Sequence, residues 1–198
     1  MRVKGIVILL LLLVAALALP TGAKPGTDPE LKDGHRDAFS ALAELPVAGS
    51  TLNVTIYLNS YSTPEDAQRL HSILADNGAT GLLKALQKMK PIGRIERTGT
   101  IGFYDFKFIL SKPTPGGRHI YAVTDRPIGF LEAYYSSRSK DYPFGILELD
   151  LKSDEDKGKE KGEGTLIYAA KLKLLDSDRV DIENVTFAPI RLLGVRKL

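Results

Sequence analysis

The chain has 198 residues, of which 43% are hydrophobic, and it contains no cysteine. The lack of cysteine excludes disulfides, thiolate catalysis, iron–sulfur clusters and zinc–thiolate sites. Lysine and arginine number 27 against 24 acidic residues; removing the first 23 residues, which hold Arg2 and Lys4, leaves 25 against 24. A nearly neutral chain gives no electrostatic reason to expect a nucleic-acid partner.

Residues 1–23 have the pattern of a secretory signal peptide. Arg2 and Lys4 precede an apolar run over residues 6–19, which Pro20 ends and small residues follow. A helix of that run is about 21 Å long, shorter than a hydrocarbon core of roughly 30 Å. A cleaved signal is therefore favoured over a membrane anchor, and we expect a periplasmic or extracellular protein without a membrane span in the mature chain.

Residues 24–46 read as a flexible leader, because proline and glycine are frequent and apolar residues are few. Within it, Phe39, Leu42 and Leu45 have a spacing that would line a short helix ending at Pro46. Residues 47–198 form a single predicted β-rich domain. Its first strong signal is the strict apolar–polar alternation over residues 51–61, which is typical of a half-buried strand.

Residues 63–90 are predicted to form a helical insertion after this first long strand. Thr63 is placed to cap a helix that Pro64 begins. The dipeptide at residues 77–78, Asn-Gly, is typical of a helix end, and a second apolar stripe follows until Pro91. The sequence therefore predicts two short helices.

Beyond Pro91 the pattern predicts only strands joined by short turns. The expected strands cover residues 106–110, 119–124, 128–135, 144–151, 165–175, 179–187 and 190–195. Short connections favour antiparallel pairing, and a long meander must close or fold over to hide its edges. The predicted class is α+β and β-dominated: an antiparallel meander that closes into a barrel or a two-sheet sandwich.

Three details of the strands can be checked against the structure. Alternation puts Glu148 and Asp150 on a solvent-facing side, opposite the leucines between them. One face of the next strand should hold Leu166, Tyr168, Ala170, Leu172 and Leu174. Residues 152–164 are rich in both charges and glycine, which predicts a mobile, charged hairpin tip.

No catalytic, cofactor or metal motif is visible. The three histidines have no metal-site spacing, no G-x-S-x-G elbow occurs, and both nucleotide-binding glycine fingerprints are missing. The weak candidate for ligand contact is the segment around residues 124–135, with Asp125, Arg126, Glu132, Tyr134 and Tyr135. In that interpretation Arg126 holds an anion and a tyrosine covers an apolar group; the alternative is a structural Asp-Arg-Pro turn fixed by an ion pair.

Three runs, TDRPIGFLEA, YPFGILELDL and VTFAPIRLLGVRKL, resemble a family of uncharacterised secreted bacterial proteins. The resemblance extends from Leu52 to Leu198. It implies a bacterial exported origin, and it implies no activity, because the family's motifs have no assigned chemistry.

Three classes of function remain open. The leading hypothesis is a non-enzymatic binding or interaction domain for an apolar small molecule or a protein partner. The first alternative is a secreted, hydrolase-like enzyme with a carboxylate and arginine site built from loops. The second is an assembly module with an exposed apolar patch. A ligand cavity is expected inside the barrel, beside small residues at positions 122, 133, 169 and 170, all alanine.

Overall fold

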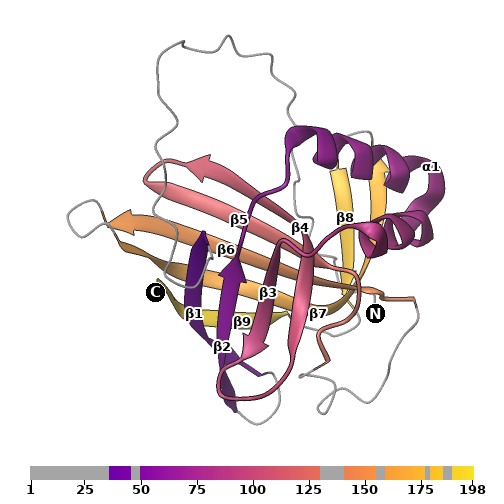
Figure 1. Ribbon diagram of the computed structural model, residues 1–198. Helices are drawn as coiled ribbons and strands as arrows, with labels where there is room; N and C mark the ends of the chain where they lie inside the picture. The colour runs from indigo at the N-terminus through magenta and orange to yellow at the C-terminus, as the bar shows by residue number, and fades with distance from the viewer. Residues whose placement is uncertain (1–35, 46–49, 130–140, 155–158, 177–178, 185–188) are drawn as a thin grey trace, which may run out of the picture.

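The computed structural model describes residues 36–45, 50–129, 141–154, 159–176, 179–184 and 189–198. The predicted signal peptide therefore lies outside the described residues, as do Glu132, Tyr134 and Tyr135 of the candidate segment. The elements, in chain order, are β1 (Asp37–Glu44), β2 (Thr51–Leu58), α1 (Pro64–Lys88), β3 (Gly93–Arg97), β4 (Phe103–Thr114), β5 (Gly117–Thr124), β6 (Phe144–Asp154), β7 (Lys159–Asp176), β8 (Arg179–Asn184) and β9 (Ile190–Lys197) (Figure 1).

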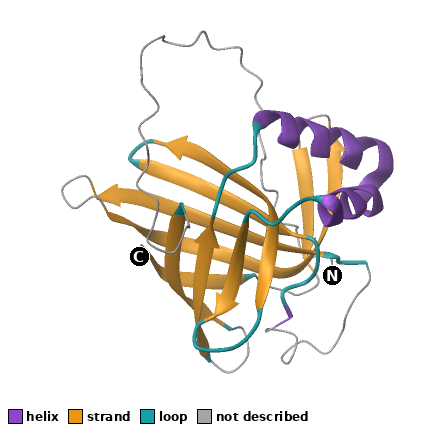
Figure 2. Ribbon diagram, in the orientation of Figure 1, coloured by secondary structure: helices purple, strands orange, loops and turns teal. Residues whose placement is uncertain are grey.

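Eight of these strands form a closed barrel (Figure 2). Strands β1 to β6 pair in sequence, β9 lies between β1 and β7, and pairing of β6 with β7 closes the ring. Every pairing is antiparallel. The prediction of a β-dominated antiparallel fold is confirmed, and the choice between barrel and sandwich is settled for the barrel.

The barrel interior is an apolar core supplied by alternate residues of the strands. Strand β2 shows the pattern most simply, because Leu52, Val54, Ile56 and Leu58 are all buried. Large side chains fill the centre, and the fully buried ones in this cluster include Phe39, Ile56, Leu58, Ile95, Phe106, Ile109, Ile120, Ile128 and Leu147. In β2 the alternation read from the sequence therefore identifies the inward face correctly.

Strand β9 contains a β-bulge, which places one extra residue in its pairing with both β1 and β7. Ser40 and Leu42 of β1 face Arg196 and Leu193, so two steps on β1 match three on β9. The pairing with β7 shows the same shift. Gly194 lies in this bulge with a φ of 58°, a left-handed conformation that glycine adopts without strain.

A second bulge lies in β7, and the side chains before and after it belong to different apolar clusters. Between Ile167 and Ala170, β7 advances three residues while β6 advances two. Leu166 and Tyr168 therefore face the barrel core, whereas Ala170 and Leu172 belong to a second apolar cluster outside it. The prediction of a single face for this strand is wrong, because one extra residue reverses the side of all that follow.

The chain leaves the barrel between β2 and β3 to form α1 and then returns. Thr63 caps the helix and accepts a hydrogen bond from the Asp66 amide, as the sequence predicted. The expectation of two separate helices is not confirmed, because α1 is one helix with a kink. Gly78, with φ of 62° and ψ of −166°, interrupts the helical geometry and folds α1 into two arms. Among the described residues, no helix is long and apolar enough to cross a membrane.

Three local expectations need correction. The predicted short helix near Phe39 is instead strand β1, which pairs with β2 and β9. Most of the predicted mobile tip at 152–164 is paired β-hairpin, from the ends of β6 and the start of β7. The start of the predicted strand at 128–135 is not a strand, because Ile128 lies in a loop, and residues 130–135 lie outside the described residues.

Candidate functional site: the crevice between α1 and the barrel

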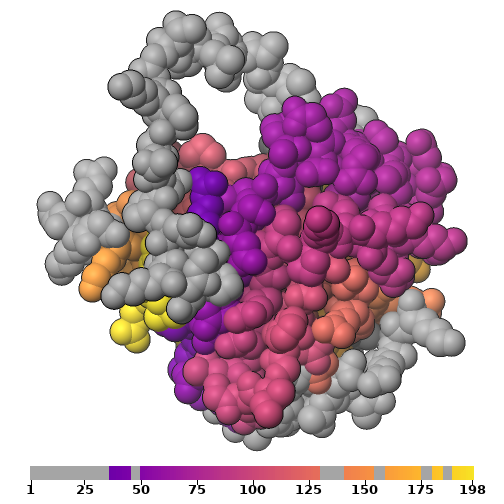
Figure 3. Space-filling view, in the orientation of Figure 1, coloured from indigo at the N-terminus to yellow at the C-terminus, as the bar shows by residue number. Residues whose placement is uncertain are grey.

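Helix α1 covers part of the outer barrel wall, and an apolar crevice runs beneath it. In the space-filling view α1 forms one side of the molecule, beside the strands (Figure 3). The crevice has a volume of about 110 Å³. Its helix wall consists of Ala67, Leu70, His71, Leu74, Leu82 and Leu86. Its barrel wall consists of Phe108, Leu110, Tyr121, Val123, Ile146, Glu148, Leu172, Val180 and Ile182. We call this space the α1 crevice.

The barrel wall is apolar because of the β7 bulge. After that bulge, Leu172 points to the outside of the barrel, where it meets Val180 and Ile182 of β8. The kink at Gly78 lets both arms of α1 lie over this surface, so that Leu74 comes from one arm and Leu82 from the other. The crevice is thus a product of two backbone irregularities rather than of regular strand or helix periodicity.

Two polar atoms on the walls of the α1 crevice are buried and make no hydrogen bond to any described residue. They are Oε1 of Glu148 on β6 and Nε2 of His71 on α1. Burial raises the pKa of the Glu148 carboxyl, because it removes solvent from the charged form. Native proteins satisfy most buried polar atoms, so an unsatisfied pair in one cavity marks a place where a ligand can supply the partners.

Tyr121 of β5 forms the edge of the crevice next to Glu148. The two residues are directly opposite each other in the β5–β6 ladder. Burial, and then the carboxylates of Glu148 and Asp150, raise the pKa of the Tyr121 hydroxyl. Lys112 lies 6.0 Å from the Tyr121 ring centre, and Asp150 is 3.3 Å from His119. One edge of the crevice is therefore polar, and the acidic groups there contribute to the raised pKa of the Tyr121 hydroxyl.

Sequence reasoning missed Glu148, which it assigned to the solvent-facing side of a strand. The alternation was correct, because Glu148 does point away from the barrel core between Leu147 and Leu149. The error lay in equating the outer face with solvent, since α1 covers that part of the wall. A usable signal exists in the sequence: the outward residues Phe108, Leu110 and Val123 of the two preceding strands are all apolar.

The residues predicted for ligand contact lie elsewhere. Arg126 donates a hydrogen bond of 3.0 Å to the Phe103 carbonyl, and its guanidinium lies 4.9 Å from the Tyr104 ring centre. Asp125 does not pair with Arg126; its carboxylate is 3.6 Å from Nζ of Lys107. The side chains of Asp125 and Arg126 thus contact different partners, and neither residue lines the α1 crevice.

Lys107 links this turn to the helix. It is the extra residue of a bulge in β4, where Phe106 and Phe108 face Thr124 and Val123. Its Nζ donates a hydrogen bond of 3.2 Å to the carbonyl of Met89, the residue that caps the end of α1. A cation at the carboxyl end of a helix is favourable, because free carbonyls gather there. Lys107 therefore fixes the second arm of α1 against the barrel.

The segment after Arg126 helps to fill the barrel. Ile128 is fully buried in the core cluster, and its amide donates a 2.8 Å hydrogen bond to the Tyr168 carbonyl. Thr124 bonds the Arg126 carbonyl and accepts a 2.7 Å hydrogen bond from the Gly145 amide. For the described part of residues 124–135, the contacts are those of a packed turn.

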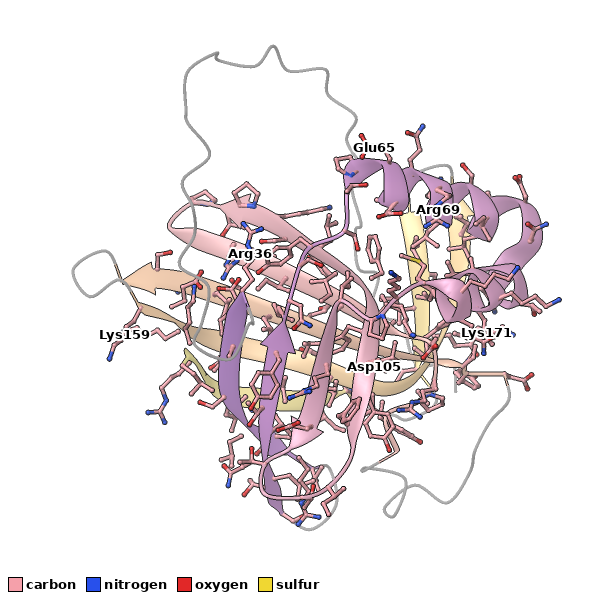
Figure 4. All side chains as sticks on the ribbon, in the orientation of Figure 1. Arg36, Glu65, Arg69, Asp105, Lys159 and Lys171 are labelled. Carbon is pink, nitrogen blue, oxygen red and sulfur yellow. The ribbon has the colours of Figure 1, made fainter. Side chains whose placement is uncertain are left out.

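A separate group of charges lies at the end of the barrel where β1, β5 and β7 begin and β9 ends. Arg118 donates to both carboxylate oxygens of Glu160, at 2.7 and 2.6 Å, and to the Tyr61 hydroxyl at 2.7 Å. Tyr61 donates to Asp37 at 2.6 Å, and Lys197 lies 2.6 Å from Asp37. Arg36 and Lys159, the sequence neighbours of Asp37 and Glu160, mark this region in Figure 4.

This network is charge-balanced, with two cations and two carboxylates around one tyrosine. Burial alone would raise the pKa of Asp37, but hydrogen bonds from Lys197 and Tyr61 and the charge of Arg118 outweigh it, so the pKa of Asp37 is lowered. Burial and the bond to Asp37 raise the pKa of the Tyr61 hydroxyl well above its usual value. Because its groups satisfy one another, the network is suited to closing the barrel end.

Within the described residues, no group of three or more histidine, aspartate or glutamate side chains could hold a metal ion. Comparisons with protein-family models, curated proteins and solved structures found no match to this chain. The candidate site is therefore argued from its geometry.

Proposed function

We propose that this protein binds a small, largely apolar molecule in the α1 crevice. The observation that carries the proposal is the combination of apolar walls with two buried, unpartnered polar atoms. Small-molecule sites have this composition: mostly hydrophobic side chains, with a few polar groups that orient the ligand. A crevice of about 110 Å³ suits a short alkyl chain or a single ring, since a dry apolar cavity of roughly 150 Å³ binds benzene.

The proposed site is on the outside of the barrel, which differs from the sequence-based expectation. Of the alanines expected beside an interior cavity, Ala122 and Ala169 lie in the barrel core cluster, among large side chains such as Phe39 and Phe106. Ala170 belongs to the outer cluster, and Ala133 is outside the described residues. Large residues occupy the space that a ligand would need within the barrel, and this favours the outer crevice.

We also propose that binding takes place outside the cytoplasm of a bacterium. The support is the signal-like pattern of residues 1–23 and the resemblance to secreted bacterial proteins. A protein of this kind would take up a small apolar molecule without catalysing a reaction on it.

The test is an NMR titration of the isotope-labelled protein with 1-hexanol, a neutral probe of suitable size. We expect the largest amide shifts at Leu70, Val123 and Ile146, which line the crevice. The variant Ala67→Leu places extra carbons in the crevice and should weaken binding. Ala75→Leu adds the same carbons at an exposed helix position and should not. Shifts that are absent, or that are equal in both variants, would refute the proposal.

A further inference from the structure

The α1 crevice has two unpartnered polar atoms on its otherwise apolar walls. Glu148 has no ion pair or hydrogen bond with any described residue, although its Oε1 is buried. A carboxylate held in that way lacks a donor, and a donor with a positive charge compensates it best. The imidazole Nε2 of His71 on the helix wall is also without a donor.

Charged groups of both signs lie near Glu148, but none of the described cations forms an ion pair with it. On its own strand Asp150 is two residues away, and on β7 the facing residue is Thr165, which carries no charge. On β5, burial raises the pKa of the Tyr121 hydroxyl, and the nearby carboxylates of Glu148 and Asp150 raise it further. Lys112 on β4 lies 6.0 Å from the Tyr121 ring centre, and His119 on β5 lies 3.3 Å from Asp150, so the basic groups on this side are placed beside other residues.

We propose that the ligand of the α1 crevice is an amphipathic amine, whose alkyl chain lies among the apolar side chains and whose ammonium group donates to Glu148. The inference rests on the proposed function, and it adds the class of ligand. An ammonium group has three donors, so one can bond Glu148 Oε1 while the others remain for further acceptors on the crevice walls. A carboxylate ligand of equal length would instead be repelled by Glu148.

The position of Glu148 makes the preference specific to molecules that carry both parts. An ammonium ion without a tail gains only an ion pair near a partly open edge, which is worth little in water. An alkyl chain without a charge gains burial, at roughly 0.8 kcal/mol for each methylene group. Only an alkylamine gains both, because its chain is buried among the apolar walls while its ammonium group pairs with Glu148.

The experiment compares four probes by calorimetry and NMR: hexylammonium, 1-hexanol, hexanoate and methylammonium. We expect hexylammonium to bind about tenfold more tightly than hexanol, which corresponds to about 1.4 kcal/mol. Hexanoate should bind more weakly than hexanol, and methylammonium should not bind in the crevice. The amide of Glu148 should shift with hexylammonium.

Two variants separate the head-group inference from the proposed function. Glu148→Gln should bind hexylammonium and hexanol equally, because the charge is lost while the crevice keeps its shape. Glu163→Gln removes an exposed carboxylate from the adjacent strand β7 and should keep the tenfold preference. Equal binding of the six-carbon probes to the unmodified protein, or an undiminished preference in Glu148→Gln, would overturn the inference while the proposed function stands. If none of the six-carbon probes binds, the proposed function itself fails.

Discussion

Arg118 on β5 and Glu160 on β7 form a two-pronged ion pair, although β6 lies between their strands. Both side chains belong to the inward-facing series of their strands, since Ile120 and Leu166 follow in the same alternation and are core residues. The guanidinium reaches across the end of the barrel and joins two strands that share no backbone hydrogen bonds. The pair is therefore a long-range link that ties the β4–β5 turn to the β6–β7 hairpin.

Replacing Arg118 with methionine should destabilise the protein by about 3 kcal/mol, because Lys197 would be the one cation of the described network left to compensate the largely buried carboxylates of Glu160 and Asp37. Urea denaturation followed by circular dichroism measures the change. The control is Arg191→Met, which removes an exposed ion pair with Glu44 and should cost less than about 1 kcal/mol. Similar losses in the two variants would contradict the role of Arg118.

Asp37 should make the folded state sensitive to acid. Its pKa in the fold is below the usual value, so its contribution to stability is complete above the usual value and is lost as pH falls through the lowered one. Unfolding free energies measured between neutral pH and about pH 3 should fall more steeply for the unmodified protein than for Asp37→Asn. Parallel curves for the two proteins would show that Asp37 does not contribute in this way.

Glu148 should have the opposite effect on the pH dependence of stability. Burial raises its pKa in the fold, so the folded state is favoured below the usual glutamate value and loses stability as pH rises through the raised one. Glu148→Gln should therefore raise the melting temperature at pH 7 and leave it nearly unchanged at about pH 4. The control Glu163→Gln, at an exposed position, should give no change at pH 7. A lower melting temperature for Glu148→Gln at pH 7 would mean that its carboxylate has a stabilising partner.

Gly78 should be required for the folded-back shape of α1. Its φ of 62° with ψ of −166° is a combination open mainly to glycine, so Gly78→Ala should cost about 1–3 kcal/mol. The same variant should weaken hexanol binding, because the two arms could no longer lie over the barrel together. Thr80→Ala, at an exposed position in the same helix, should change neither property. Unchanged stability in Gly78→Ala would show that the kink has another cause.

Local patterns in the sequence predict the barrel strands well. The alternation around Leu147 and Leu149 is strict, and both residues lie in the core as expected. Short turns between strands also predict the antiparallel order correctly, because hairpins leave few other choices. The prediction fails where a bulge adds one residue and so reverses which side chains face inward, as in β7 after Tyr168. Nothing in the amino-acid composition of the strand indicates such a bulge.

The candidate site is harder to predict because it depends on contacts between distant segments. Glu148 becomes buried only when α1 covers β6, and neither sequence segment shows that contact by itself. Glu160 lies in a stretch so rich in charge that it reads as solvent-exposed, yet Arg118, 42 residues earlier, draws it into the barrel end. Conversely, Asp125 and Arg126 stand out as neighbours in sequence, but their side chains bond different partners.

The placement of β9 has a consequence for how the molecule is made. Among the described strands, β1 and β7 are joined only through β9, so the ring stays open until residues 190–197 take their place in it. A sheet without β9 has two bare borders, at β1 and at β7, and such borders invite pairing with other polypeptides. A polypeptide in which this strand is missing or misplaced would therefore be prone to aggregation.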